Sequence, residues 1–502
     1  MSNKKHLSQT IMSSWLSLLI TSACQLVMIP IALAALTKVD FALFAVITQM
    51  LTAVMLAEIG IRSACARLLI DARAKGETEY NKVWMASVCV FCIQATVMFL
   101  LIFILAPFLG QIFHLDPEQC SAATELFIAV GIINTVGYTL SIFSTALIAG
   151  QRLSQVNVIA SLCAIVHVVI FVICIKSGLK LWSYPVSMLA AMVCSQTLII
   201  YRALKMKIVG KFDFKLLEWA EVKVIFTLGM DVFVAALFSV VMGHSLLLFS
   251  GHLLTLEQTA ILAVNLKLVN MMTQILHRIP GSAEPMLMKM VSDKKDEQFR
   301  VWWQLITKMT ILSALFCAGM FVFWNKLVVS TWTSDEMVMQ GAALVLLALI
   351  PFRFLVHYVF VNSLAIFKEI RKVKWFLLWE VVLYSGLAFM LGQEFGLVGL
   401  LSANLLSMLG GALLRGMKCF AFYSAIPFRK LLMLFIRLTL PLVSAFYVLF
   451  VFANRFENLE ILYSIRMSIC WSLLCVVICY FFVFDSSDRL HLNSLVLKIK
   501  NG

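Results

Sequence analysis

Residues 156–175 read VNVIASLCAIVHVVIFVICI, a run of twenty residues without a charged side chain. A helix of this length spans the ~30 Å hydrocarbon layer of a membrane. Similar apolar blocks recur along the 502-residue chain, which is 62% hydrophobic and 13% charged, with a mean hydropathy of +0.97. Soluble domains are about a quarter charged. The sequence therefore predicts an all-α integral membrane protein and excludes a soluble enzyme.

Apolar blocks separated by charged residues predict about fourteen transmembrane helices. The first block is longer than the apolar part of a cleaved leader, so it is expected to remain as the first helix. The predicted spans are 11–35, 41–61, 83–106, 122–149, 156–175, 183–204, 224–249, 254–280, 301–324, 339–366, 376–392, 396–415, 431–453 and 463–484.

The positive charges follow these spans. Of the 40 Lys and Arg residues, 29 fall on the side of the N-terminus when Arg202 and Arg415, at the ends of two spans, are counted with the tails and loops, and 5 fall on the opposite side. Cytoplasmic loops of membrane proteins are enriched in Lys and Arg. Both termini are therefore expected in the cytoplasm, and the net charge of +14 reflects topology rather than nucleic-acid binding. The outer loops are short, so function is expected between the helices.

An internal repeat organises the chain. A shift of 218 residues aligns 36–84 with 254–302 without a gap, with ten identities in 49 positions, and both segments end in Val-Trp. A shift of six helices preserves orientation, which indicates parallel repeats. We expect an N-terminal six-helix bundle at 1–205, a C-terminal six-helix bundle at 206–418, and an additional two-helix segment with a cytoplasmic tail at 419–502. In transporters built this way, substrate binds between the bundles.

Three stretches carry a family resemblance. LTKVDFALFA at 36–45 leads into EIGIRSACAR at 58–67, and TLEQTAILA occupies 255–263 in the second half. With the six-plus-six-plus-two pattern, they resemble the polysaccharide-transporter branch of the multidrug/oligosaccharidyl-lipid/polysaccharide exporter superfamily, whose fold is MATE-like. His244 departs from an acidic residue common in relatives, and the first helix lacks the charge found in lipid II flippases. The second departure argues against the lipid II branch.

The resemblance implies a flippase in the bacterial inner membrane, working by alternating access without ATP or a cofactor. Its cargo would be an undecaprenyl-diphosphate-linked oligosaccharide repeat unit of O-antigen or a similar surface polysaccharide. Proton coupling is the energy source proposed for the family. Besides membrane lipid, the implied partners are a polysaccharide polymerase and a chain-length regulator.

The predicted eighth helix carries the strongest candidate binding residues. Lys267, Asn270, Gln274 and Arg278 are spaced three, four and four apart, which places them within an arc of roughly 80° on one helix face. Ionisable residues within a span usually face a cavity or a partner. Cations and amides together offer charge-assisted hydrogen bonds to a diphosphate. The alternative is that Arg278 reaches the inner interface and the others form a buried structural network.

Four further charged residues are candidates. Arg353 is too deep in its span to reach the interface, and it either lines the cavity or pairs with an acid such as Glu380 or Asp231. Arg62 is a candidate for substrate binding or a positive-inside anchor. Glu58 and Asp231 are the proton-coupling candidates, although a structural role is the stronger alternative for Asp231.

Two other functions remain open on the sequence. A MATE-like ion-coupled exporter of another amphipathic substrate would share the fold, but such exporters of cationic drugs favour acidic cavities. A polysaccharide polymerase or ligase typically acts through a large outer loop, which this chain lacks. The residues therefore favour a transporter of an anionic cargo, and not an enzyme.

Overall fold

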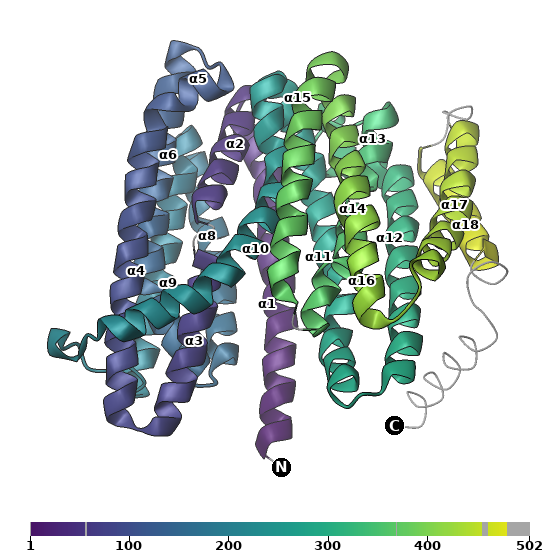
Figure 1. Ribbon diagram of the computed structural model, residues 1–502. Helices are drawn as coiled ribbons and strands as arrows, with labels where there is room; N and C mark the ends of the chain where they lie inside the picture. Colours follow the sequence, from purple (N-terminus) through teal and green to yellow (C-terminus); the bar gives the residue numbers. More distant parts are fainter. Residues whose placement is uncertain (1, 56–57, 368, 454–459, 479–502) are drawn as a thin grey trace. The chain divides into compact units, whose positions relative to one another are not determined.

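The computed structural model describes residues 2–55, 58–367, 369–453 and 460–478 (Figure 1). These residues are almost entirely helical and contain no β-strand. Ten of their helical stretches are long and apolar enough to cross a membrane, and one of them, Trp375–Ser424, covers two of the predicted helices. The predicted all-α membrane fold is confirmed, while the number of about fourteen crossings stays a prediction.

The chain divides into two compact units, Met1–Ala260 and Ile261–Gly502. The described helices of the first unit are α1 (Ser2–Ala35), α2 (Lys38–Val54), α3 (Glu58–Lys75), α4 (Glu77–Leu105), α5 (Leu109–Phe113), α6 (Pro117–Leu140), α7 (Ile142–Ala149), α8 (Leu153–Lys176), α9 (Ser183–Lys205) and α10 (Trp219–Leu253). Short 3₁₀ turns lie at Ala106–Phe108, Lys180–Trp182 and Phe214–Leu216.

Long antiparallel helices build the first unit. In Figure 1, α4 and α6 run side by side, and α8 packs against both α1 and α9. Helix α10 packs against α2, α3 and α4, so its contacts place it in the first unit. The boundary between the two compact units therefore lies one helix beyond the division between residues 205 and 206 that the repeat predicts. The division at 205/206 concerns the two copies of the repeat, and it stays a prediction.

The described helices of the second unit begin with α11 (Leu256–Ser292), whose first residues precede the boundary. The others are α12 (Asp296–Trp332), α13 (Gly341–Ala348), α14 (Ile350–Phe360), α15 (Ile370–Met408), the π-helix η7 (Leu409–Gly416), α16 (Met417–Ser424), α17 (Phe428–Ala453) and α18 (Glu460–Ile478). Shorter 3₁₀ elements are η5 (Asp335–Met337) and η6 (Asn362–Phe367). Helix α15 is divided by a kink at Gly396, the first residue of the predicted twelfth helix.

The charged segments that follow the second and eighth predicted helices are helical rather than loops. Helix α3 continues to Lys75, and α11 continues to Ser292. A membrane limits how far an apolar surface extends, but it does not end the backbone hydrogen bonding of a helix. Charged side chains such as Arg67 and Arg73 are exposed along α3.

Backbone turns repeat at the same 218-residue shift as the sequence. Residues with positive φ pair as Gly76 (125°) with Lys294 (56°), Gly178 (82°) with Gly396 (55°), and Lys207 (50°) with Ala425 (52°). Positive φ is uncommon outside glycine. Three coincidences at one shift extend the repeat beyond 36–84, as far as residue 207 of the first half.

The additional helices are fixed to α12. Hydrogen bonds between α12 and α18 include Trp324 Nε1 of α12 to Ser468 Oγ (2.6 Å), and Ser464 Oγ and Trp471 Nε1 of α18 to the carbonyls of Phe323 and Phe316 (both 2.9 Å). Gly319 leaves room for the indole of Trp471, because a Cβ at Gly319 would lie 2.4 Å from Nε1. The second unit therefore includes α18 as a packed helix.

Candidate functional site

The polar row predicted on the eighth helix lies on α11. Lys267 and Asn270 are half-buried, whereas Gln274 and Arg278 are exposed. On the opposite side of the helix, apolar residues such as Val269 are buried. The apolar side therefore holds α11 in its unit and leaves the two cations and two amides outside the apolar core.

Asn265 fixes the first half of α11. Its Nδ2 donates to the carbonyl of Met337 (2.8 Å), and its Oδ1 accepts from Nδ2 of Asn325 on α12 (2.8 Å). Asn265 and Asn325 are both almost fully buried. Buried polar groups that satisfy one another specify a single arrangement of the helices that carry them. The rotation of α11, and with it the direction of Lys267 two residues later, is set here.

Tyr358 of α14 fixes the second half of α11. Its hydroxyl donates to Glu284 Oε2 (2.5 Å), and the ring of His277 packs edge-on against the tyrosine, with 4.4 Å between ring centroids. A cavity of about 20 Å³ beside this contact is lined by Glu284, Thr307, Tyr358 and Ser363 among others. That volume holds about one water molecule. The contact forms a small polar site next to the row of α11.

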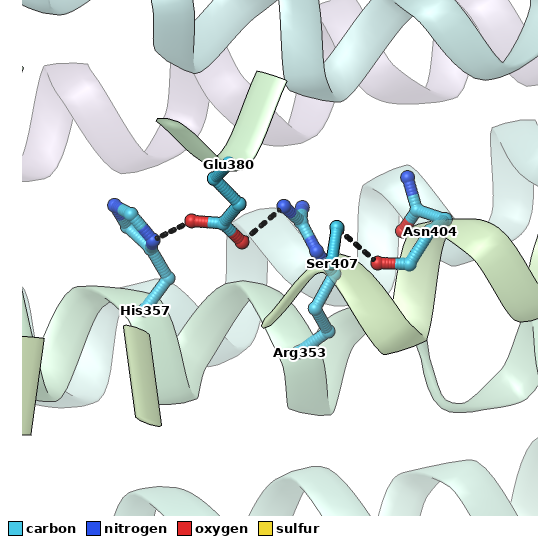
Figure 2. Close-up of polar contacts among 5 residues, drawn as sticks. All are labelled: Arg353, His357, Glu380, Asn404 and Ser407. Atoms are coloured by element: carbon cyan, nitrogen blue, oxygen red, sulfur yellow. Dashed lines mark hydrogen bonds and ion pairs between the residues drawn. The ribbon is translucent and has the colours of Figure 1, made fainter. Parts of the chain in front are cut away.

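Arg353 lies in a buried charged cluster, shown in Figure 2. Its Nη2 is 2.6 Å from Glu380 Oε1, and Nδ1 of His357 is 2.7 Å from Glu380 Oε2. The Glu380 side chain is fully buried, and those of Arg353 and His357 are 6% and 9% exposed. We call Arg353, His357 and Glu380 the buried triad. The structure thus shows the pairing with an acid that the sequence allowed as the alternative for Arg353.

A π-helix makes room for the triad. Gly411 of η7 packs on Glu380, and a Cβ there would lie 2.9 Å from Oε2 and 3.0 Å from the glutamate Cβ. Gly410 and Gly416, in the same element, allow equally close packing by Leu383 and Val361. π-Helical segments within helices occur frequently at functional sites. The glycines let η7 approach α14 and α15 closely enough to enclose the charges.

The remaining candidates lie elsewhere. Arg62 of α3 donates from Nη2 to Ser144 Oγ of α7 (2.6 Å), which ties two helices of the first unit together. The side chains of Glu58 and Asp231 lie outside the described residues. The structure therefore groups Lys267, Asn270, Gln274 and Arg278 on one helix face, and Arg353 forms a separate cluster.

Sequence reasoning missed Glu284. The predicted eighth helix ends at residue 280, which leaves Glu284 outside the span. In α11 it follows His277 by seven residues, two helical turns along the same face. That spacing was the available signal.

An apolar cavity also lies in the second unit. It measures about 110 Å³ and is bordered by α12, α13, α17 and α18, with Leu315, Val345, Leu442, Phe446 and Trp471 among its lining residues. Nearly all of this lining is apolar. The cavity therefore suits a hydrocarbon group rather than a sugar or phosphate.

These features define a multi-pass helical membrane protein. The polysaccharide biosynthesis protein family matches residues 7–291, more than half of the chain. The chain therefore belongs to that family. A search of curated proteins returns no match.

Solved structures share the fold at low sequence identity. The chain is similar to the lipid II flippase MurJ in an inward closed conformation, with 12% identity, coverage of 94% of this chain and 98% of MurJ, and a TM-score of 0.71. An inward-facing multidrug resistance MATE transporter of the MOP superfamily gives 13% identity, coverage of 84% and 98%, and a TM-score of 0.62. A Vibrio cholerae MATE transporter gives 13% identity, coverage of 86% and 98%, and a TM-score of 0.56. The chain thus shares its fold with these flippase and transporter structures.

Proposed function

We propose that this protein moves an undecaprenyl-diphosphate-linked oligosaccharide, the repeat unit of O-antigen or a similar surface polysaccharide, from the cytoplasmic to the periplasmic leaflet of the bacterial inner membrane. The observation that carries the proposal is the row of Lys267, Asn270, Gln274 and Arg278 on α11, in a chain of the polysaccharide biosynthesis family. Both termini are proposed to be cytoplasmic, from the distribution of Lys and Arg.

The chemistry of this row suits a diphosphate. A diphosphate carries charge and several acceptor oxygens, and Lys and Arg supply charge-assisted donors to them. The amides of Asn270 and Gln274 can donate to phosphate or sugar oxygens and accept from sugar hydroxyls. The α11 row thus matches the polar end of the cargo, and the apolar cavity beside α18 offers a surface to part of the polyprenyl chain.

The two cations of the α11 row have no charged counterpart in the first half of the repeat. At the 218-residue shift, Lys267 corresponds to Gln49 and Arg278 to Gly60. A repeat preserves the helices on which its fold depends, so a charge present in one copy only is not required by the fold itself. This asymmetry supports a role for the two cations in binding cargo.

Complementation tests the proposal. In a strain that lacks this protein, lipid-linked repeat units should accumulate on the cytoplasmic side, and the wild-type chain should restore surface polysaccharide. Lys267→Met should restore at least about tenfold less surface polysaccharide than the wild type, since a charged hydrogen bond contributes about 1.5–3 kcal/mol. Lys267→Arg keeps the charge and should retain more activity.

Lys176→Met serves as the matched control, because it removes an exposed lysine at the end of α8 and should behave as wild type. All variants are compared at equal levels in the membrane. The flippase proposal fails if repeat units reach the periplasm unpolymerised in the deletion strain. The site assignment alone fails if Lys267→Met restores polysaccharide fully.

A MATE-like ion-coupled exporter is the second candidate, favoured by the fold shared with MATE transporters. It predicts that deletion changes resistance to amphipathic toxic compounds while lipid-linked repeat units stay at their normal level. Measuring both in the same deletion strain separates the two functions.

A further inference from the structure

The buried triad has one acid and one permanent cation, so its third member decides its charge. Arginine stays protonated in proteins, and it balances the carboxylate of Glu380 at 2.6 Å. His357 adds no charge when neutral and a full positive charge when protonated. The triad is thus neutral in one state and carries a charge of +1 in the other, inside a unit where uncompensated charge is unfavourable.

Among the described residues, no hydrogen bond fixes the protonation state of the His357 ring. Nε2 is buried and lacks a hydrogen-bond partner among the described residues, and Nδ1 lies 2.7 Å from Glu380 Oε2 without the alignment of a full hydrogen bond. The proton state of a histidine is normally set by the hydrogen bonds that its two ring nitrogens make. This ring keeps Nε2 open to a proton.

The fold does not require the triad. At the repeat shift, Arg353 corresponds to Thr135 and Glu380 to Leu162, so the first half carries neither charge at these positions. A buried ion pair is also weak support for stability, because well-packed apolar residues often replace one without loss. The triad, and the π-helix that encloses it through Gly411, are therefore additions specific to the second half.

Few other titratable groups face the triad. On α15, Tyr384 lies one turn beyond Glu380 and is buried, and on η7, Arg415 stacks on the ring of Trp379. Helices α13 and η6, which pack on α15, carry no titratable side chain. Lys308 is buried on α12, which packs on α14. Among the described residues, Glu380 is the carboxylate within reach of His357.

We propose that His357 and Glu380 form a proton-binding site in the second unit. The proton is taken up on His357 Nε2, the imidazolium contacts Glu380 Oε2 through Nδ1, Arg353 holds the carboxylate in place, and the triad then carries a charge of +1. Uptake changes the charge between α14, α15 and η7 by one, and release restores neutrality. One proton per cycle at this site would drive export of the cargo; that last step rests on the proposed function.

The site is tested first without cargo. Purified protein in nanodiscs is melted at pH values from about 5 to 8, the range in which histidine titrates. If His357 takes up a proton, the Tm of the wild type varies with pH, and His357→Gln removes more than about half of that variation. His167→Gln, which removes an intramembrane histidine of the first unit, should leave the variation in place. An unchanged pH profile in a folded His357→Gln variant overturns the proposal.

Transport provides the second test. In proteoliposomes, a pH gradient should accelerate movement of a lipid-diphosphate oligosaccharide by wild-type protein and by His167→Gln, but not by His357→Gln. The double variant Arg353→Met/Glu380→Gln, which leaves no unpaired buried cation from the ion pair, should also lose the acceleration. Acceleration that persists in both folded variants overturns the assignment. If wild-type protein moves no such lipid, the proposed function fails, and the melting profiles still decide the proton site.

Discussion

Tyr358 donates a hydrogen bond to Glu284, with 2.5 Å between the oxygens, and this contact joins α14 to α11. The preceding residue, His357, contacts Glu380 of α15. Consecutive residues on a helix point about 100° apart, so α14 reaches two different helices through two adjacent side chains. Helix α14 therefore links the helix that carries the α11 row to the proposed proton site.

Tyr358→Phe tests this link. The substitution removes the hydroxyl but keeps the ring that packs on His277. Hydrogen bonds to charged groups contribute about 1.5–3 kcal/mol, and we expect a loss near the lower end because Glu284 is only half-buried. The Tm of purified protein measures the loss, and complementation should fall with it. Tyr201→Phe, at an exposed tyrosine of α9, should change neither. A Tyr358→Phe variant as stable and active as the wild type would show that this hydrogen bond contributes to neither stability nor transport.

The pair of Arg353 and Glu380 should behave non-additively. Removing one member of a buried ion pair leaves the other charge uncompensated and typically costs about 3–5 kcal/mol. We therefore expect Arg353→Met and Glu380→Gln each to lower the Tm sharply, and the double variant to be more stable than either. Thermal melts of the wild type, the two single variants and the double variant form a double-mutant cycle, which measures the interaction between the two side chains. Additive losses would indicate that the two side chains do not interact as the 2.6 Å distance implies.

Gly411 and Gly386 form a matched pair for testing the π-helix. A Cβ at Gly411 would meet Glu380, whereas a Cβ at Gly386 of α15 would meet nothing within 4 Å. Gly411→Ala should destabilise the protein by about 1–3 kcal/mol through overpacking. Gly386→Ala should stabilise it by up to about 1 kcal/mol, because alanine favours the helix. Equal effects of the two substitutions would contradict the close packing of η7 on the glutamate.

Much of the fold could be predicted from the sequence because a membrane fixes the length and composition of its helices. The break in α15 at Gly396 falls at the first residue of the predicted span 396–415. The ends of α3 and α11 could not be predicted this way, since hydropathy reports where apolar surface stops and not where a helix stops. The contact boundary after Ala260 depends on how α10 packs, and helix packing leaves no periodic signal in a uniformly apolar sequence.

The candidate site was predictable where it depends on one helix. The spacing of Lys267, Asn270, Gln274 and Arg278 determines a shared face whatever the surroundings of α11. For Arg353, the choice between a cavity and an acid depends on which helices meet, and the sequence left both open. The contact of Tyr358 with Glu284 joins residues 74 positions apart, and no local pattern predicts such a pair.

The packing of Trp471 provides a test of how firmly α18 is held. Trp471→Phe removes the indole donor and leaves the carbonyl of Phe316 without it, which should cost about 1–3 kcal/mol. Gly319→Ala attacks the same contact from α12, because the added methyl meets the indole ring. Both variants should lower the Tm and make α18 more susceptible to proteolysis in nanodiscs. Trp375→Phe, the same change at an exposed tryptophan, should do neither. If the two variants lower the Tm but cut flippase activity no further than their folded fraction explains, α18 serves stability. If activity falls further, the apolar cavity that Trp471 lines takes part in handling the lipid chain.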